Sequence, residues 1–142
     1  VEFWSDPHND DLRFARVRTR KNVLPNLEEN LGPGITDALV RSADLLRDDA
    51  DALDSFAREY FAQTDPLNLS VNELERLPRA IRTRVLRLAI YQAGAPSGSL
   101  SAEHINGAEA LISDWHGQKE LSLPGDVKLL RNSGRITLST NK

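Results

Sequence analysis

Residues 35–63, with the sequence ITDALVRSADLLRDDADALDSFAREYFAQ, decide the fold of this 142-residue chain. Apolar residues recur there at intervals of seven, and an alanine follows each of the first three by four positions; the set is Leu39, Leu46, Leu53 and Tyr60 with Ala43, Ala50 and Ala57. Residues three and four apart lie on one side of a helix, so this spacing predicts one long amphipathic helix. We expect the alanines to allow close approach of a neighbouring helix, and the aspartates between them to face water.

Helical signals continue on both sides of this segment. Apolar spacing predicts a helix over residues 12–30 that kinks or restarts at Pro25, because proline has no amide N–H to donate. Ser70, with Glu73 three residues later, predicts a capping box that opens a short helix. A further helix is expected to start at Pro78, and another at the N-cap Ser101, ending near residue 117.

After residue 117 the hydrophobic period changes from that of a helix to two. Leu121 and Leu123 alternate with polar residues, and turn signals follow at residues 124–125 and 132–134. This pattern is typical of short antiparallel strands. The predicted fold class is therefore mainly α: a helical bundle with one long amphipathic helix and a small C-terminal antiparallel β-hairpin or sheet.

Composition limits the classes of function. Hydrophobic residues make up 39% of the chain, which suffices for the core of one ordinary domain. The absence of cysteine excludes disulfides, thiolate zinc sites and a cysteine nucleophile. No apolar run approaches the length needed to cross a bilayer, so we expect a cytoplasmic protein without a membrane partner. The chain also lacks methionine, so we expect it to be a piece of a longer protein.

Charge is segregated along the chain. The formal net charge is -3, which gives no overall attraction to nucleic acid. Residues 31–66 hold eight acidic and three basic residues, whereas residues 67–100 hold two acidic and five basic residues. Any binding to nucleic acid must therefore be local.

The first basic group follows an acidic turn near the N-terminus. Helical geometry predicts that Arg13, Arg16 and Arg20 form a row on one face, which suits phosphate recognition. We expect Asp6 and Asn9 to cap the turn before this row and so to order its entry. A metal site at the side-chain oxygens of Asp6, Asn9 and Asp11 is disfavoured, because the ladder of ligands and the closing glutamate of a calcium loop are missing.

The second basic group lies on the helices predicted after residue 70. Two interpretations stay open for it: ion pairs with the acidic long helix, or contacts with the phosphates of tRNA or DNA. Across both groups, the candidate phosphate-binding residues are Arg13, Arg16, Arg20, Arg79, Arg82, Arg84 and Arg87. No catalytic residue is predicted, because no nucleophile, base and binding loop occur together.

Three blocks of sequence resemble bacterial tRNA(Ile)-lysidine synthases. The first resembles the end of their catalytic domain and consists of Asp6, Pro7, Asn9, Asp11, Phe14, Arg16, Arg20, Leu24, Pro25 and Leu27. The second resembles their substrate-binding region and consists of Leu77, Pro78, Arg82, Val85, Leu86, Arg87, Gly94, His104 and Ile105. The third resembles their closing hairpin and consists of Leu123, Pro124, Gly125, Val127, Arg131, Gly134 and Ile136.

This resemblance implies an ATP-dependent ligase that joins lysine to the wobble cytidine of the isoleucine tRNA anticodon. ATP and Mg²⁺ would bind a catalytic part outside this sequence, because the Ser-Gly-Gly-x-Asp-Ser loop of the family is absent, and this chain alone would be inactive and bind neither. Arg16 and Arg20 would lie at the rim of the active site, with Asp6 and Asn9 ordering that rim. Implied partners are isoleucine tRNA, lysine and ATP, with a homodimer possible.

The resemblance also implies a division of the chain into three parts. Residues 1–31 would end the catalytic domain and carry the arginine helix, residues 32–66 would form a connecting helix, and residues 67–142 would form the substrate-binding domain of the short bacterial type. Val17 departs from the family, where asparagine commonly follows the first arginine. The alternative function is a non-catalytic helical scaffold or protein-interaction module whose arginines form internal or partner salt bridges.

Overall fold

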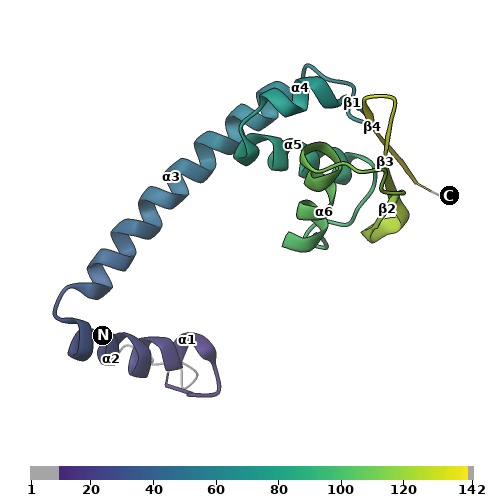
Figure 1. Cartoon of the computed structure of the whole chain (residues 1–142). Coiled ribbons are helices and arrows are strands. Elements are labelled where there is room, and N and C mark those ends of the chain that lie inside the picture. The colour runs from purple at the N-terminus through teal and green to yellow at the C-terminus, as the bar shows by residue number, and fades with distance from the viewer. Residues whose placement is uncertain (1–9, 141–142) are drawn as a thin grey trace, which may run out of the picture. The chain divides into compact units, whose positions relative to one another are not determined.

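The computed structural model describes residues 10–140 of the chain (Figure 1). These residues belong to two compact units, and the boundary between them falls between Asp49 and Ala50, inside the long helix α3 (Ile35–Phe61). The predicted long helix is therefore confirmed, and it contributes residues to both units. The predicted fold class is also confirmed, since helices predominate and the chain closes with antiparallel strands.

The first unit begins with three consecutive helical segments: α1 (Ala15–Arg18), the π-helical turn η2 (Thr19–Val23) and α2 (Leu24–Leu31). Pro25 lies in the first turn of α2 and cannot donate to a carbonyl in the preceding turn. Directly before it the helix widens, and the Leu24 N–H donates to the Thr19 carbonyl five residues earlier. The predicted restart at Pro25 is confirmed. The predicted helical position of Arg13 is wrong, because α1 begins only at Ala15.

A side chain from α2 caps the start of α3. The Glu28 carboxylate accepts hydrogen bonds from the backbone N–H groups of Gly34, at 2.7 Å, and Thr36, at 2.8 Å. These bonds, those from Thr36 first, lower the pKa of Glu28. Gly32 and Gly34 have φ angles of 103° and 94°, which permit the sharp turn between the two helices. The long helix thus starts where a carboxylate satisfies its first N–H groups.

The apolar positions of α3 are buried only in part of the helix. Ala57 is completely buried, and Leu53 and Tyr60 are half-buried. Leu39 and Leu46, on the same heptad positions nearer the start, are 47% and 67% exposed. The spacing therefore predicts the apolar face of the helix correctly. Among the described residues, other parts of the chain pack on that face only near the C-terminal end of α3.

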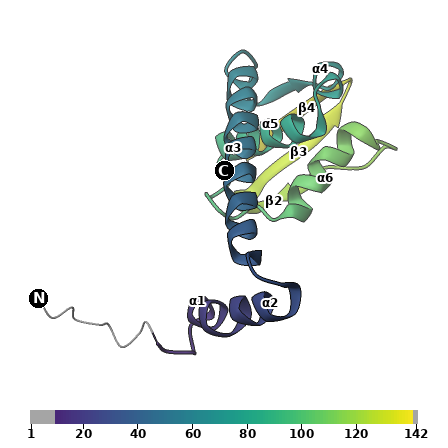
Figure 2. The ribbon, with the colours of Figure 1, turned by 90° about the vertical axis from the view of Figure 1, so that its left-hand side faces the viewer.

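The second unit combines helices with a four-stranded antiparallel sheet. Its strands run in the order β1-β4-β3-β2, and helices α5 and α6 lie over one face of the sheet (Figure 2). The helices are α4 (Val71–Arg76), α5 (Arg79–Gln92) and α6 (Ala102–Ser113), and the strands are β1 (Asn68–Ser70), β2 (Leu121–Leu123), β3 (Val127–Asn132) and β4 (Arg135–Thr140).

The strands after residue 117 agree with the predicted hairpin, and the caps of two helices agree with the predicted ones. A 3₁₀ turn, η3 (Pro124–Asp126), joins β2 to β3. The Ser70 hydroxyl accepts from Glu73 N–H, which confirms the serine half of the predicted capping box, and the Ser101 hydroxyl accepts from His104 N–H, which confirms that N-cap. Strand β1 was not predicted: its three residues pair with β4, with Leu69 opposite Ile136.

One hydrophobic core lies between the helices and the sheet of the second unit. Helix α5 buries Val85, Leu86, Ala89 and Ile90. The buried residues include Val85, Leu86, Ala89 and Ile90 of α5, Ile105, Ala108, Leu111 and Ile112 of α6, and Leu69, Val127, Leu129, Ile136 and Leu138 of the sheet. Ala57 of α3 belongs to this core, which ties the second half of α3 to the domain.

Replacing Ala57 with leucine should destabilise the second unit. No part of the alanine side chain is exposed, so three further carbon atoms must displace packed neighbours, at a cost of about 1–3 kcal/mol in the free energy of unfolding. Urea unfolding of Ala57→Leu measures this. The matched control is Ala52→Leu, at an exposed position of the same helix, where a change within about 0.5 kcal/mol is expected. Equal stability of the two variants would contradict the proposed packing.

Candidate nucleic-acid interface

Arg13 and Asp11 form a local ion pair ahead of α1. The Arg13 Nη2 lies 2.7 Å from the Asp11 Oδ2, and the backbone N–H of Arg13 donates to Oδ1 of the same carboxylate at 2.9 Å. Asp11 thereby closes a turn of two residues. Arg13 thus lies in a turn before α1, outside the helical part of the predicted row, and its charge is partly offset by Asp11.

Arg16, Arg18 and Arg20 are all exposed in the segment that follows. The guanidinium carbon of Arg16 lies 5.3 Å from the centroid of the Phe14 ring, and Arg20 lies in η2. Arg18 is used locally: its Nη1 donates to the carbonyls of Leu12 and Arg13 at 2.9 Å and 2.7 Å. Asp6 and Asn9, predicted to order this region, lie outside the described residues. The first unit therefore presents two of its three predicted phosphate ligands on α1 and η2.

Arg82 is held inside the second unit. Its side chain is 11% exposed and forms a hydrogen-bonded ion pair with Glu109 of α6, whose side chain is 9% exposed. Its Nη1 also donates to the carbonyls of Leu74 and Leu77, at 3.4 Å and 3.3 Å. Arg82 therefore joins α4, α5 and α6, and little of its guanidinium faces solvent.

Arg79 and Arg84 have partners but keep part of their surface exposed. Arg79 Nη2 donates to the side-chain oxygen of Asn106 at 2.8 Å, and its side chain is 63% exposed. Arg84 Nε donates to Oδ1 of Asp54 on α3 at 2.6 Å, and its Nη1 donates to the Ala80 carbonyl. The pairing of an arginine with the acidic long helix, one of the two interpretations left open, occurs at Arg84.

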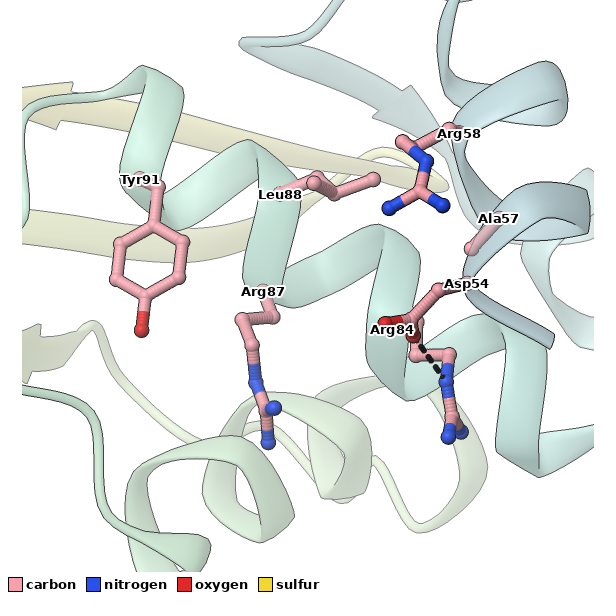
Figure 3. Close-up of a pocket in the computed structure, with 7 residues that line it drawn as sticks. All are labelled: Asp54, Ala57, Arg58, Arg84, Arg87, Leu88 and Tyr91. Atoms are coloured by element: carbon pink, nitrogen blue, oxygen red, sulfur yellow. Dashed lines mark hydrogen bonds and ion pairs between the residues drawn. The ribbon is translucent and has the colours of Figure 1, made fainter. Parts of the chain in front are cut away.

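Arg87 lies beside a hollow of about 90 Å³ in the second unit (Figure 3). The hollow is lined by Asp54, Ala57 and Arg58 of α3 and by Arg84, Arg87, Leu88 and Tyr91 of α5. Sequence reasoning did not select Arg58, because it stands in the acidic segment, nor Tyr91. Helical spacing could have indicated both residues, because residues four apart lie on one face of a helix. Arg58 stands four residues after Asp54, and Tyr91 stands four residues after Arg87.

The environment of Glu109 makes its ionised form favourable. Burial alone would raise its pKa, but hydrogen bonds from Arg82 and Ser113 and the charges of Arg82 and Arg79 outweigh burial and lower the pKa. A carboxyl whose pKa is lowered on folding stabilises the fold above its ordinary value of 4.5. That contribution is lost as the pH falls through the lowered value.

Glu109→Ala should destabilise the protein at pH 7 by about 3 kcal/mol, because it leaves Arg82 buried without its partner. Urea unfolding at pH 7 and at several pH values below 4.5 measures the effect. The variant should lack the part of the acid-induced loss that comes from Glu109, so its difference from the unmodified protein should shrink as the pH falls. Glu103→Ala, on the exposed side of α6, is the control. A constant difference at all pH values would contradict a role for the charge of Glu109.

His104 has a structural partner. Its Nδ1 accepts from the Ser101 N–H at 3.1 Å, which completes a capping box at the start of α6. Within residues 10–140, no group of three or more histidine, aspartate or glutamate side chains is arranged to hold a metal ion. No helix in the same range is long and apolar enough to span a membrane.

Comparison with known proteins agrees with this arrangement. Residues 69–137, from β1 into β4, match the family model of the TilS substrate binding domain. This part of the chain is therefore similar to that domain. The matched residues span α4, α5 and α6 and most of the sheet, and α1, η2, α2 and α3 precede them.

The similarity to lysidine synthases extends over nearly the whole chain. The chain is 49% identical over 142 residues to the tRNA(Ile)-lysidine synthase of Thermobifida fusca, covering 99% of this chain and 44% of that protein. It is 46% identical over 137 residues to that of Streptomyces coelicolor, covering 95% and 39%. For that of Leifsonia xyli subsp. xyli the identity is 47% over 144 residues, covering 96% and 42%. The resemblance seen in the sequence is confirmed, and the chain spans less than half the length of these relatives.

Proposed function

We propose that this chain is the tRNA-binding portion of an ATP-dependent tRNA(Ile)-lysidine synthase, which joins lysine to the wobble cytidine of the isoleucine tRNA anticodon. The match of residues 69–137 to a substrate binding domain carries this proposal. Lysine, ATP and Mg²⁺ would bind a part of the enzyme outside this sequence, and the reaction would take place in the cytoplasm. In this chain the ligand is RNA, and the binding groups are arginines.

The exposure of particular arginines supports the proposal. Arg16 and Arg20 in the first unit and Arg79 and Arg87 in the second are exposed. Phosphate contacts by such guanidinium groups provide affinity and register without reading bases. Because the net charge is -3, these local groups must supply the attraction. Asp6 and Asn9 lie outside the described residues, and their ordering of this rim stays a prediction from the sequence.

The scaffold alternative draws support from a different observation. Arg82 and Arg84 form ion pairs inside the second unit, with Glu109 and Asp54, and so behave as that alternative expects. Their pairing does not extend to Arg87, whose guanidinium has no hydrogen bond or ion pair among the described residues. A scaffold module would show no salt-dependent retention of tRNA, which separates the two functions experimentally.

The double variant Arg16→Ala, Arg20→Ala should bind isoleucine tRNA at least about tenfold more weakly than the unmodified chain. Each lost phosphate contact should also reduce the slope of log affinity against log salt by about 0.7–0.9. Fluorescence anisotropy of labelled tRNA, titrated with the purified chain at several salt concentrations, measures both quantities.

The matched control is Arg41→Ala, Arg47→Ala, which removes two exposed arginines from α3 of the same unit. Its affinity and salt slope should stay near those of the unmodified chain. Equal losses in the two double variants would show that only overall charge matters. Unchanged binding by the Arg16 and Arg20 variant would remove these residues from the interface.

A further inference from the structure

Trp115 is an exposed tryptophan of the second unit. It stands two residues after the end of α6, and 48% of its surface is exposed. Tryptophan side chains are highly buried on average, because the ring carries a large apolar area. Within residues 10–140, the indole N–H of Trp115 has no hydrogen-bond partner. The fold therefore leaves a large flat ring and a hydrogen-bond donor in contact with solvent.

A guanidinium group supports this ring from one side. The guanidinium carbon of Arg131, on β3, lies 4.8 Å from the centroid of the Trp115 ring. The Arg131 Nη1 donates to the carbonyls of Leu111 and Ile112, at 2.8 Å and 3.1 Å. These carbonyls belong to the last turn of α6, where carbonyls lack partners inside the helix. Arg131 is thereby held in place, and its attraction to the ring orients Trp115.

Hydrogen bonds also order the loop that carries Trp115. The Gln118 Oε1 accepts from the His116 N–H at 2.8 Å, and the Gln118 Nε2 donates to the Asp114 carbonyl at 2.7 Å. Gly117 has a φ angle of 89°, which permits the sharp turn between these groups. The bonds engage the residues on both sides of Trp115, so its backbone is ordered before a ligand arrives. A group ordered in advance loses less entropy on binding.

An exposed and oriented aromatic ring suits a nucleobase. Every base has a flat π face, and RNA-binding proteins stack unpaired bases on exposed aromatic side chains. A protein partner would instead favour a wider apolar patch, whereas Trp115 is the one large apolar residue within positions 113–120 of the sequence. A base carries no net charge, so the exposed Asp114 next to Trp115 does not exclude it.

We propose that Trp115 stacks on an unpaired base of the bound tRNA. Arg131 lies over one face of the ring, so the base would lie on the opposite face, and Arg131 would serve as a positioning residue. The inference rests on the proposed function and deepens it, because the arginine contacts to phosphates do not touch bases. Trp115 would add a contact to a base.

Trp115→Ala should weaken binding of isoleucine tRNA by the whole chain about tenfold. The slope of log affinity against log salt should not change, because a stacked base displaces no counterion from a phosphate. Trp115→Phe should retain most of the affinity, since an aromatic face remains, whereas Trp115→Leu should lose about as much as Trp115→Ala. The matched control is Phe56→Ala, which removes a 57% exposed aromatic ring from α3 and should bind as the unmodified chain does.

The fluorescence of Trp115 reports the stack directly. The chain has two tryptophans, so Trp4→Phe leaves Trp115 as the single fluorescent indole. Titration with isoleucine tRNA should quench this fluorescence with the midpoint that anisotropy gives for binding. A fully paired RNA duplex should leave the fluorescence unchanged, because its bases are already stacked on one another. Urea unfolding of every variant separates loss of binding from loss of folding.

The remaining outcomes separate this inference from the function it rests on. If the unmodified chain binds tRNA and Trp115→Ala matches Phe56→Ala, without quenching, the inference is wrong and the proposed function stands. Equal affinities of Trp115→Leu and Trp115→Phe would refute stacking.

Two outcomes would assign the ring to another ligand and refute the RNA contact. One is quenching of Trp115 by ATP but not by tRNA, which would indicate a free nucleotide. The other is a dimer that sedimentation detects and Trp115→Ala abolishes at unchanged tRNA affinity, which would indicate a protein contact. Failure of the unmodified chain to retain tRNA at any salt concentration would overturn both proposals.

Discussion

The buried pair of Arg82 and Glu109 is the interaction on which the arrangement of the second unit depends. Such a pair stabilises a fold only when further hydrogen bonds satisfy the desolvated groups. Here the Leu74 and Leu77 carbonyls accept from Arg82, and the Ser113 hydroxyl donates to Glu109. Three helices are thereby held in one geometry, and α5 is fixed so that Arg79 and Arg87 are exposed.

The arginines of α5 therefore differ in their roles. Arg82 is internal, Arg84 is shared with α3, and Arg87 is exposed. Sequence spacing alone does not separate these cases, because the partner of Arg82 is 27 positions away on α6. The packing of α5 against α6 and α3 decides which arginine forms an internal ion pair. Core residues such as Leu86 and Ile90 set that packing.

The sequence predicted the elements that depend on interactions between residues close together in the chain. The heptad spacing of α3, the restart at Pro25 and the serine caps at Ser70 and Ser101 all act within a few residues, and the structure contains each of them. Strand β1 was missed because three residues carry too little pattern, and its partner in β4 lies 67 positions further along. The Asp11 pair that holds Arg13 was missed because a short turn competed with the expected first turn of helix.

In the proposed binding of RNA, the acidic face of α3 would act by exclusion. Asp44, Asp48 and Asp51 are exposed and repel phosphates at short range, whereas salt screens this repulsion beyond about 10 Å. Under that proposal, an RNA strand would be favoured only beside the arginines, and the penalty elsewhere would restrict the ways in which it can bind. A net charge of -3 is thus compatible with RNA binding, because specificity depends on the difference between attractive and repulsive surfaces of the same molecule.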